Sequence, residues 1–250
     1  MRTLTILFIA ALALTACDAN PYSPGLPAEQ KADNDRTGPG IENSVSPDIQ
    51  LRGVNLAGAD FGEDSMPGTF GTDYIYPSNE EIDYYTAKGM TVFRLPFRWE
   101  RLQHEAFDEF DEAELARIRS IVEHSRFRGA TVILDPHNYA RYYEDVIGEP
   151  ELPVEAFEDF WSRLASEFAN DDKVIFGVMN EPAEMATELW LDDANAAIDA
   201  IRSTGADNLL LIPGNGYTGA HSWLFDDYGT PNGDVMADII DPANNYAYEL

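Results

Sequence analysis

Short apolar runs alternate with helical patterns at a regular interval from Leu51 to the end of the chain. The predicted strands begin near residues 51, 91, 130, 174, 209 and 246, so that successive starts lie 35–44 residues apart. Continuous apolar strands that alternate with helices are typical of a parallel sheet covered by helices. This spacing restricts the chain to the α/β class.

Helical patterns fill the intervals between these runs. Ser78 and Glu81 form a capping box, which predicts the start of a first helix. Two further helices are predicted over residues 111–128 and, approximately, 188–204, each followed by a glycine. Pro96 is expected to interrupt the second strand. The helix between these two has an apolar stripe made of Val154, Phe157, Trp161, Leu164 and Phe168.

Two architectures fit this alternation: an open doubly wound sheet and a closed (β/α)8 barrel. The sequence contains neither G-x-G-x-x-G nor G-x-x-x-x-G-K-[ST] at the first helix junction, which disfavours a nucleotide-binding open sheet. Polar residues instead follow almost every predicted strand, as at the carboxyl-end rim of a barrel. They are Asn55, Arg94, His137, Asn138, Asn180, Glu181 and Asn215. We therefore predict a (β/α)8 TIM barrel.

The chain is short for such a barrel. Eight units at this spacing need about 310 residues after the first strand, whereas Leu51 to the end comprises 200 residues. The sequence also stops inside an apolar, strand-like run that begins near Tyr246. The expectation is a barrel truncated within its sixth strand.

The first 48 residues differ in character from the rest. Residues 1–17 contain Arg2, an apolar run over 4–14 and then Cys17, which resembles a bacterial lipoprotein signal whose cysteine becomes lipidated. A plain secretory signal is the alternative. Residues 18–48 are rich in Pro, Asp, Asn, Ser and Gly and predict a flexible tether, leaving 49–250 as the catalytic barrel. The expected location is the bacterial cell envelope, with export followed by lipid anchoring.

Charge and cysteine content exclude several classes of function. The chain has 16 Lys and Arg against 45 Asp and Glu, a formal charge of −29, which disfavours binding to nucleic acid or to anionic lipid. Its single cysteine lies in the signal, so that no disulfide within one chain is expected. The four histidines show no metal-ligand spacing, and we therefore expect no metal. We also expect no cofactor, and we expect the protein to be a monomer.

The most specific local signal is the run Val-Met-Asn-Glu-Pro over residues 178–182. A glutamate placed at a barrel rim by a rigid strand is suited to general acid/base chemistry. Glycoside hydrolysis requires such a group, first to protonate the leaving oxygen and then to activate water. The alternative is that Glu181 and Pro182 merely begin a helix.

Other strand ends carry matching motifs. Phe-Arg-Leu-Pro occupies residues 93–96, Asp-Pro-His-Asn-Tyr-Ala-Arg occupies 135–141, Arg-Gly-Val-Asn-Leu-Ala-Gly occupies 52–58, and Ile-Pro-Gly-Asn occupies 212–215. Together these motifs resemble family 5 glycoside hydrolases of clan A, which are (β/α)8 barrels that cleave β-glucans with retention. The resemblance covers the folded part and is closest to the endo-β-1,4-glucanase (cellulase) branch.

The resemblance implies roles for individual residues. Glu181 is the acid/base, Asn180 contacts the sugar, Arg94 supports the nucleophilic carboxylate, and His137 lines the site. Asn55 and Asn138 are expected to support the site or bind substrate. Tyr139, Tyr217 and Trp223 lie in strand-end loops, where aromatic rings can stack on pyranose rings.

The family's nucleophile is a glutamate at the end of the seventh strand, which lies beyond Leu250. Glu144, Glu149 and Glu184 do not occupy an equivalent position. The 250-residue chain on its own is therefore expected to be inactive.

The resemblance implies a retaining endo-acting β-glucan hydrolase that cleaves β-1,4-linked glucan. Two alternatives remain open from the sequence. One is the same chemistry on mannan, xyloglucan or β-1,3-glucan, and the other is a non-catalytic carbohydrate-binding lipoprotein.

Overall fold

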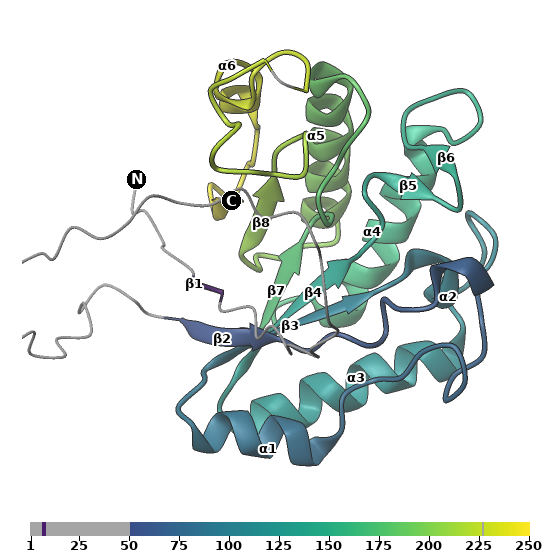
Figure 1. The fold of residues 1–250 in the computed structure, drawn as a ribbon, viewed down its shortest axis with the longest axis vertical. Coiled ribbons are helices and arrows are strands. Elements are labelled where there is room, and N and C mark those ends of the chain that lie inside the picture. The colour runs from purple at the N-terminus through teal and green to yellow at the C-terminus, as the bar shows by residue number, and fades with distance from the viewer. Residues whose placement is uncertain (1–6, 9–50, 227) are drawn as a thin grey trace, which may run out of the picture.

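Six parallel strands of the folded region form one curved sheet, which fans across the centre of the molecule (Figure 1). The computed structural model describes residues 7–8, 51–226 and 228–250. The strands are β2 (Arg52–Asn55), β3 (Val92–Phe97), β4 (Thr131–Pro136), β7 (Val174–Gly177), β8 (Leu210–Pro213) and β9 (Tyr246–Glu249). All six predicted strands are thereby confirmed.

A further short strand, β1 (Leu7–Phe8), pairs in parallel with β2 at the edge of the sheet. It comes from the apolar run that was interpreted as an export signal. The other residues of that run, Cys17 and the predicted tether lie outside the described residues. The signal, the tether and the lipidation site thus stay predictions.

Strand order separates the two architectures considered from the sequence. The order is β1-β2-β3-β4-β7-β8-β9, so that neighbours along the chain are neighbours in the sheet and the order never reverses. A doubly wound sheet would contain a reversal, where its ligand site lies. A sequential parallel sheet with its helices on one side is an arc of a (β/α)8 barrel, and the barrel prediction is confirmed.

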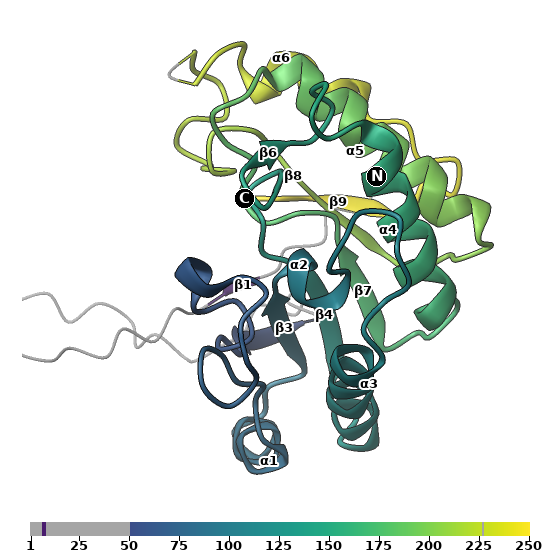
Figure 2. The same ribbon diagram turned by 90° about the vertical axis from the view of Figure 1, so that its right-hand side faces the viewer.

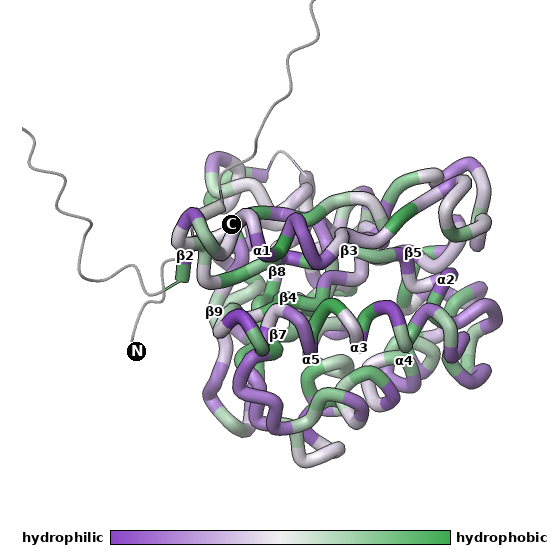
Figure 3. Tube along the Cα trace, turned by 90° about the horizontal axis from the view of Figure 1, so that it is seen from below, coloured by the Kyte–Doolittle hydropathy of each residue, from purple (hydrophilic) through white to green (hydrophobic). Residues whose placement is uncertain are grey.

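Four long helices cover the outer face of this arc (Figure 2). They are α1 (Asn79–Ala87), α3 (Glu112–Phe127), α4 (Val154–Phe168) and α5 (Thr187–Ser203). Their bounds agree with the predicted ones to within a few residues. In Figure 3 the colour alternates between hydrophobic and hydrophilic along α3 and α5, as expected for helices that bury one face.

Helix starts follow the capping signals. The Ser78 hydroxyl accepts from the Glu81 main-chain N–H at 3.3 Å, and the Glu81 carboxylate accepts from Ser78 N at 2.8 Å. At the start of α3, Asp111 accepts from the main-chain N–H groups of Ala113 and Glu114, both at 2.9 Å. Each cap satisfies N–H groups that have no partner inside the helix.

Apolar side chains gather on both faces of the sheet. The larger cluster lies between strands and helices and includes the fully buried Trp161, which was predicted to be core. A smaller cluster on the inner face contains Val92, Ile133, Ile175 and Leu211. These inner residues form one layer of a barrel interior. Side chains two residues further along each strand therefore point toward the rim above that layer.

Pro96 does not end the second strand, and that prediction was wrong. β3 continues to Phe97, and Pro96 pairs in register with Asp135 of β4. The main chain of Arg94, two residues earlier, bonds toward the β2 side, where the Leu56 N–H donates to the Arg94 carbonyl at 2.9 Å. Pro96 faces the same side, beyond the end of β2. Its missing N–H therefore removes no hydrogen bond from the sheet.

Several short elements were not predicted. They are η1 (Glu63–Ser65), α2 (Trp99–Leu102), the hairpin of β5 (Arg141–Tyr142) and β6 (Asp145–Val146), α6 (Asn232–Val235) and η2 (Met236–Asp238). They lie in segments that follow the strands, and α2 and the hairpin flank the rim of the sheet. Among the described residues no helix has the length and apolar content needed to cross a membrane.

Candidate active site at the carboxyl ends of the strands

Arg94 is the centre of a polar cluster on the rim of the sheet. Its side chain is buried, and Nη1 donates to Oδ1 of Asn55 at 3.1 Å, while Nη2 donates to Oδ1 of Asn180 at 2.6 Å. Nη2 also lies 2.9 Å from Oδ2 of Asp135. Three of the predicted site residues, from segments up to 125 positions apart (Asn55 to Asn180), thus meet at one guanidinium. Asp135 belonged to a recognised motif but had not been assigned a role.

The charges around Arg94 keep it ionised. Burial alone would lower the pKa of Arg94, but the carboxylates of Asp135 and Glu249, with smaller effects from Glu181 and Asp60, raise it above its ordinary value. A buried guanidinium is stable only with such partners. Arg94 is therefore a permanent positive charge on the inner side of the rim.

His137 is held between acidic and phenolic groups. The His137 Nδ1 atom lies 2.9 Å from Oδ2 of Asp135. Because a carboxylate oxygen can only accept a hydrogen bond, Nδ1 is the donor. In the neutral ring Nε2 then accepts from the Tyr139 hydroxyl at 3.3 Å. Asp60 lies on the far side, with Oδ2 4.0 Å from Nε2. Asp135 thereby links His137 to Arg94, and Asp60 is a further rim residue that sequence reasoning missed.

Glu181 follows directly after the Asn180 that binds Arg94. Its main chain has φ of 40°, in the left-handed region that a residue with a Cβ rarely adopts. Hydrogen bonds on both sides hold this turn: Asn180 N donates to Pro136 O at 2.9 Å, and Tyr217 N donates to Pro182 O at 3.1 Å. Glu181 is half-buried. Strain of this kind is found where surrounding structure fixes a functional side chain.

Tyr139 lies close to Glu181. Burial raises the pKa of the Tyr139 hydroxyl, and the Glu181 charge raises it further. The Tyr139 N–H donates to the Asn180 carbonyl at 3.1 Å. The loop after β4 is thus attached to the loop that carries the predicted acid/base. Glu181, Asn180, Tyr139 and His137 all lie on one side of the rim.

The amide nitrogen of Asn180 is buried without a protein partner among the described residues. Asn180 is almost fully buried, and among the described residues Nδ2 has no hydrogen-bond partner. An unsatisfied buried N–H group costs about 1–3 kcal/mol unless a ligand or water accepts from it. Because Arg94 fixes Oδ1, it also fixes the direction of Nδ2.

Glu249 is a site residue that sequence reasoning missed. It ends β9, its side chain is 14% exposed, and Oε1 lies 3.7 Å from Nε of Arg94. Burial raises the pKa of Glu249 to about 7, and the charges of Asp135 and Glu181 add to this against the opposing effect of Arg94. The sequence did contain one signal for this role. Glu249 ends the sixth predicted strand two residues after Ala247, and side chains two residues apart on a strand point to the same face.

Three predicted substrate contacts lie elsewhere. Asn138 is 3% exposed, accepts from Trp99 N at 2.8 Å and donates to Oε2 of Glu100 at 2.8 Å, so that it supports α2 and does not join the Arg94 cluster. Tyr217 is exposed and contacts Tyr228 edge to face at 5.9 Å between ring centroids. Trp223 is half-buried and packs against the core. These two aromatic rings lie in the loop after β8.

No group of three or more His, Cys, Asp or Glu side chains is arranged as a metal site within the described part of the chain. Cys17 is outside that part.

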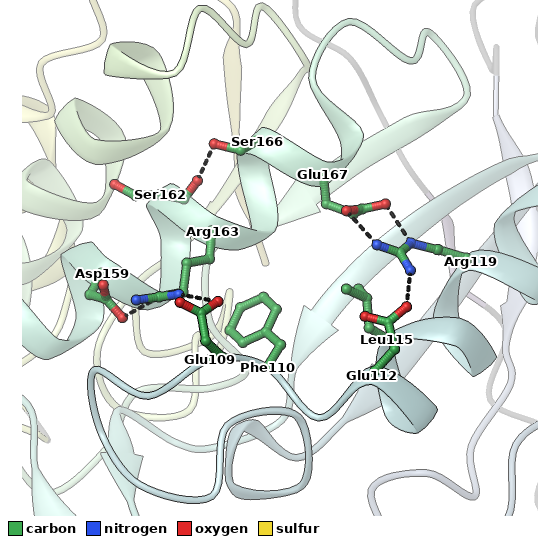
Figure 4. Close-up of a pocket in the computed structure, with 10 residues that line it drawn as sticks. All are labelled: Glu109, Phe110, Glu112, Leu115, Arg119, Asp159, Ser162, Arg163, Ser166 and Glu167. Carbon is green, nitrogen blue, oxygen red and sulfur yellow. Dashed lines mark hydrogen bonds and ion pairs between the residues drawn. The ribbon is translucent and has the colours of Figure 1, made fainter.

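One groove lies away from this rim. It has a volume of about 520 Å³ and runs between α3 and α4 on the outer face of the helices (Figure 4). Its two arginines already bind carboxylates: Arg119 contacts Glu167 at 2.5 Å and Glu112 at 2.6 Å, and Arg163 contacts Glu109 and Asp159, both at 2.8 Å. Both arginines are thus paired, and the groove carries four carboxylates against two guanidinium groups.

Known proteins resemble this chain in sequence and in fold. The family model for cellulase, glycosyl hydrolase family 5, matches residues 48–250. Endo-beta-1,4-glucanase B of Emericella nidulans is 39% identical over 199 residues, which are 79% of this chain and 58% of that protein. An endo-beta-1,4-glucanase structure from Xanthomonas axonopodis pv. citri superposes with a TM-score of 0.78 at 46% identity, covering 80% of this chain and 63% of that one. A structure of XacCel5A in complex with cellopentaose gives a TM-score of 0.77 at 45% identity, covering 79% and 63%.

The chain spans less than two thirds of the length of these relatives, at 58% and 63%. Within that span the match includes every strand from β2 to β9 and both rim motifs built around Arg94 and Glu181. The resemblance inferred from the sequence is confirmed: this chain belongs to glycosyl hydrolase family 5.

Proposed function

We propose that the protein is a retaining endo-β-1,4-glucanase with Glu181 as its general acid/base. The observation that carries this proposal is the position of Glu181 in a constrained turn directly after Asn180, whose side chain is fixed by Arg94. Acid catalysis of glycoside cleavage needs a carboxyl group held beside the leaving oxygen and donors held against the sugar. Relatives at 39% and 46% identity that carry the name endo-beta-1,4-glucanase support β-1,4-linked glucan as the substrate.

Each rim residue then has a defined task. Glu181 protonates the departing oxygen and later removes a proton from the attacking water. The Asn180 amide, with Nδ2 unsatisfied and buried, donates to a sugar hydroxyl near the reacting carbon. Arg94 stabilises the carboxylate that forms the covalent intermediate by charge-assisted hydrogen bonds. We assign that nucleophile to the seventh strand, after Leu250, as the family resemblance implies.

Hydrolysis of cellopentaose by the product of the complete reading frame tests this proposal. Retention predicts that NMR detects the β-anomer first among the new reducing ends, because double displacement inverts the anomeric carbon twice. First appearance of the α-anomer would refute the retaining mechanism. Faster turnover of mannan, xyloglucan or β-1,3-glucan would assign that polysaccharide as the substrate instead. Binding without cleavage of any of these glycans would show a carbohydrate-binding protein.

We also propose that Cys17 anchors the protein to the bacterial cell envelope and that residues 18–48 hold the barrel away from the membrane. The support is the signal-like sequence of residues 1–17 and the polar, Pro-rich composition that follows. Metabolic labelling with a fatty-acid analogue should mark the wild type and not Cys17→Ser. A wild-type protein that is released into the medium without label would show that residues 1–17 are a plain secretory signal.

A further inference from the structure

Glu249 lies against Arg94, but the motifs assigned to the reaction do not include it. Its side chain leaves β9 on the same face as Ala247, which packs with the inner apolar cluster. The Glu249 carbonyl accepts from the Thr218 hydroxyl at 2.7 Å, and Glu249 pairs in register with Pro213 of β8. β9 runs beside β8 (Figure 2). The main chain of Glu249 is thus held by the loop after β8, and its carboxyl group is directed into the rim.

Arg94 donates to three partners and faces a fourth group. Nη1 binds Asn55, and Nη2 binds Asn180 and Asp135. The remaining nitrogen, Nε, is the one that faces Glu249, at 3.7 Å from Oε1. This distance is longer than a hydrogen bond, which for a charged pair is about 2.7–2.9 Å. One guanidinium therefore fully engages one carboxyl group, Asp135, and only approaches a second.

We propose that Glu249 is a positioning residue that controls the orientation of Arg94 and, through Arg94, of Asn180. While the Glu249 carboxyl group is uncharged, Arg94 remains on Asn180 and Asp135. Once it is charged, the carboxylate draws Nε toward itself and turns Nη2 away from Asn180. The effect on catalysis rests on the proposed function, whereas the effect on Arg94 does not.

The surrounding charges place this change near neutral pH. The groups that act on Glu249 are Arg94 on β3, Asp135 on β4, His137 after β4 and Glu181 after β7. Burial is the largest cause of the raised pKa of about 7, and the like charges of Asp135 and Glu181 oppose ionisation further. Because the carboxylates of Asp135 and Glu181 already share this rim with one guanidinium, Glu249 keeps its proton until the pH approaches that value and then releases it to solvent.

Movement of Arg94 away from Asn180 affects the reaction in a specific way. The Asn180 side chain loses the 2.6 Å hydrogen bond that fixes its Oδ1, so that Nδ2 no longer points at the sugar hydroxyl. Misplacement of a positioning group by about 1 Å can cost about 10²-fold in rate. The expected signature is a loss of kcat/KM at alkaline pH that does not come from the acid/base.

The Arg94 Nε resonance tests the first step without any activity measurement. In a ¹H–¹⁵N spectrum of the full protein, the Arg94→Lys variant identifies this signal by its disappearance. We expect the signal to titrate with a midpoint near pH 7 in the wild type and in the control Glu123→Gln, which alters an exposed glutamate on α3. It should remain fixed in Glu249→Gln. A wild-type signal that stays still from about pH 5.5 to about 8.5 would overturn the proposal.

The pH dependence of kcat/KM on dinitrophenyl β-cellobioside tests the second step. Its leaving group needs no proton, so the acid role of Glu181 drops out of the first chemical step. Wild type and Glu123→Gln should lose about 10-fold in kcat/KM between about pH 6.5 and 8.5, and Glu249→Gln should vary by less than about 2-fold. Identical profiles for wild type and Glu249→Gln would refute the catalytic consequence.

The two measurements separate the two proposals. A titrating Arg94 signal in a protein that does not cleave the cellobioside would refute the glucanase function and leave the Glu249–Arg94 coupling established. An active enzyme with an invariant Arg94 signal would refute the Glu249–Arg94 coupling and leave the glucanase function standing. If Glu249→Gln fails to fold, an invariant Arg94 signal in the wild type still overturns the first step.

Discussion

Nη2 of Arg94 donates a 2.6 Å hydrogen bond to Oδ1 of Asn180, the residue immediately before the proposed acid/base. These two residues are 86 positions apart in the chain: Arg94 lies on β3 and Asn180 follows β7, and these two strands are separated in the sheet by β4. The bond fixes which end of the Asn180 amide faces Arg94. It also couples the permanent charge of Arg94 to the loop that carries Glu181.

Replacement of Arg94 by lysine should abolish this coupling while it keeps the charge. A lysine ammonium is a point charge and cannot reproduce the planar fork that binds Asn55, Asn180 and Asp135 together. Loss of one or two hydrogen bonds to charged groups, at about 1.5–3 kcal/mol each, predicts a fall in kcat/KM of about 10²-fold or more. Steady-state kinetics on cellopentaose measure this fall.

Arg119→Lys is the matched control. Arg119 also binds two carboxylates, but it lies in the outer groove between α3 and α4 (Figure 4). A partly exposed ion pair contributes about 0–1 kcal/mol, so this variant should retain its kinetics. Equal losses for both variants would show that Arg94 acts through general stability.

Glu181→Gln should separate proton donation from the rest of the reaction. The amide preserves the shape but cannot protonate the leaving oxygen, and we expect kcat on cellopentaose to fall about 10²–10⁴-fold. Cleavage of dinitrophenyl β-cellobioside should show a much smaller loss in the first step, because its leaving group needs no proton. Glu184→Gln, three residues away and with a side chain that is 75% exposed, serves as the control. Equal losses on both substrates would remove Glu181 from the acid role.

Local patterns in the sequence were sufficient to predict the strands, the long helices and the barrel. The apolar runs correspond to β2, β3, β4, β7, β8 and β9, and the capping box at Ser78 begins α1 as predicted. These features depend on residues within one element. Pro96 shows the limit of such patterns, because whether a proline ends a strand depends on where the neighbouring strand stops.

The site was predictable only where a motif carried it. Arg94, Asn180, His137 and Glu181 lie in recognisable strand-end motifs and meet on one rim. Asp60 and Glu249 have no local motif, and their importance comes from side chains 77 and 155 positions away in the chain, His137 and Arg94. Such contacts are a property of the tertiary fold, which sequence periodicity does not report.

Asn138 provides a test of structure against motif. It lies beside His137 in a rim motif, yet its side chain bonds inward to Trp99 N and Glu100. Asn138→Ala would leave both of these buried groups without a partner, at a cost of about 2–4 kcal/mol in the free energy of unfolding. Urea denaturation should show this loss, while KM for cellopentaose stays near the wild-type value.

Asn79→Ala, at an exposed position at the start of α1, is the control for Asn138→Ala and should change stability by about 0.5 kcal/mol or less. A raised KM with unchanged stability in Asn138→Ala would instead favour the direct substrate contact expected from the sequence.

Asp193 on α5 should make stability fall as the pH rises. It is 1% exposed, Oδ2 has no hydrogen-bond partner among the described residues, and a Cβ at Gly148 would lie 2.6 Å from Oδ1. The carboxyl group thus faces main chain and not a cation. Burial raises the pKa of Asp193 to about 7, and the charges of Asp192 and Glu149 raise it further.

The sign follows from proton linkage. Between the unfolded pKa of about 3.9 and the folded value near 7, the folded state binds more protons than the unfolded state. The stabilisation is complete below the lower value and is lost as the pH rises through the higher one. Asp193→Asn removes the ionisation and should stabilise the protein at pH 8 by about 4 kcal/mol, or about 8–16 °C in Tm. The difference should shrink toward zero near pH 4.5.

Asp199→Asn, at an exposed position on the same helix, should show no such trend. An Asp193→Asn variant that is less stable than the wild type at pH 8 would mean that the carboxylate has a partner there and is not buried alone.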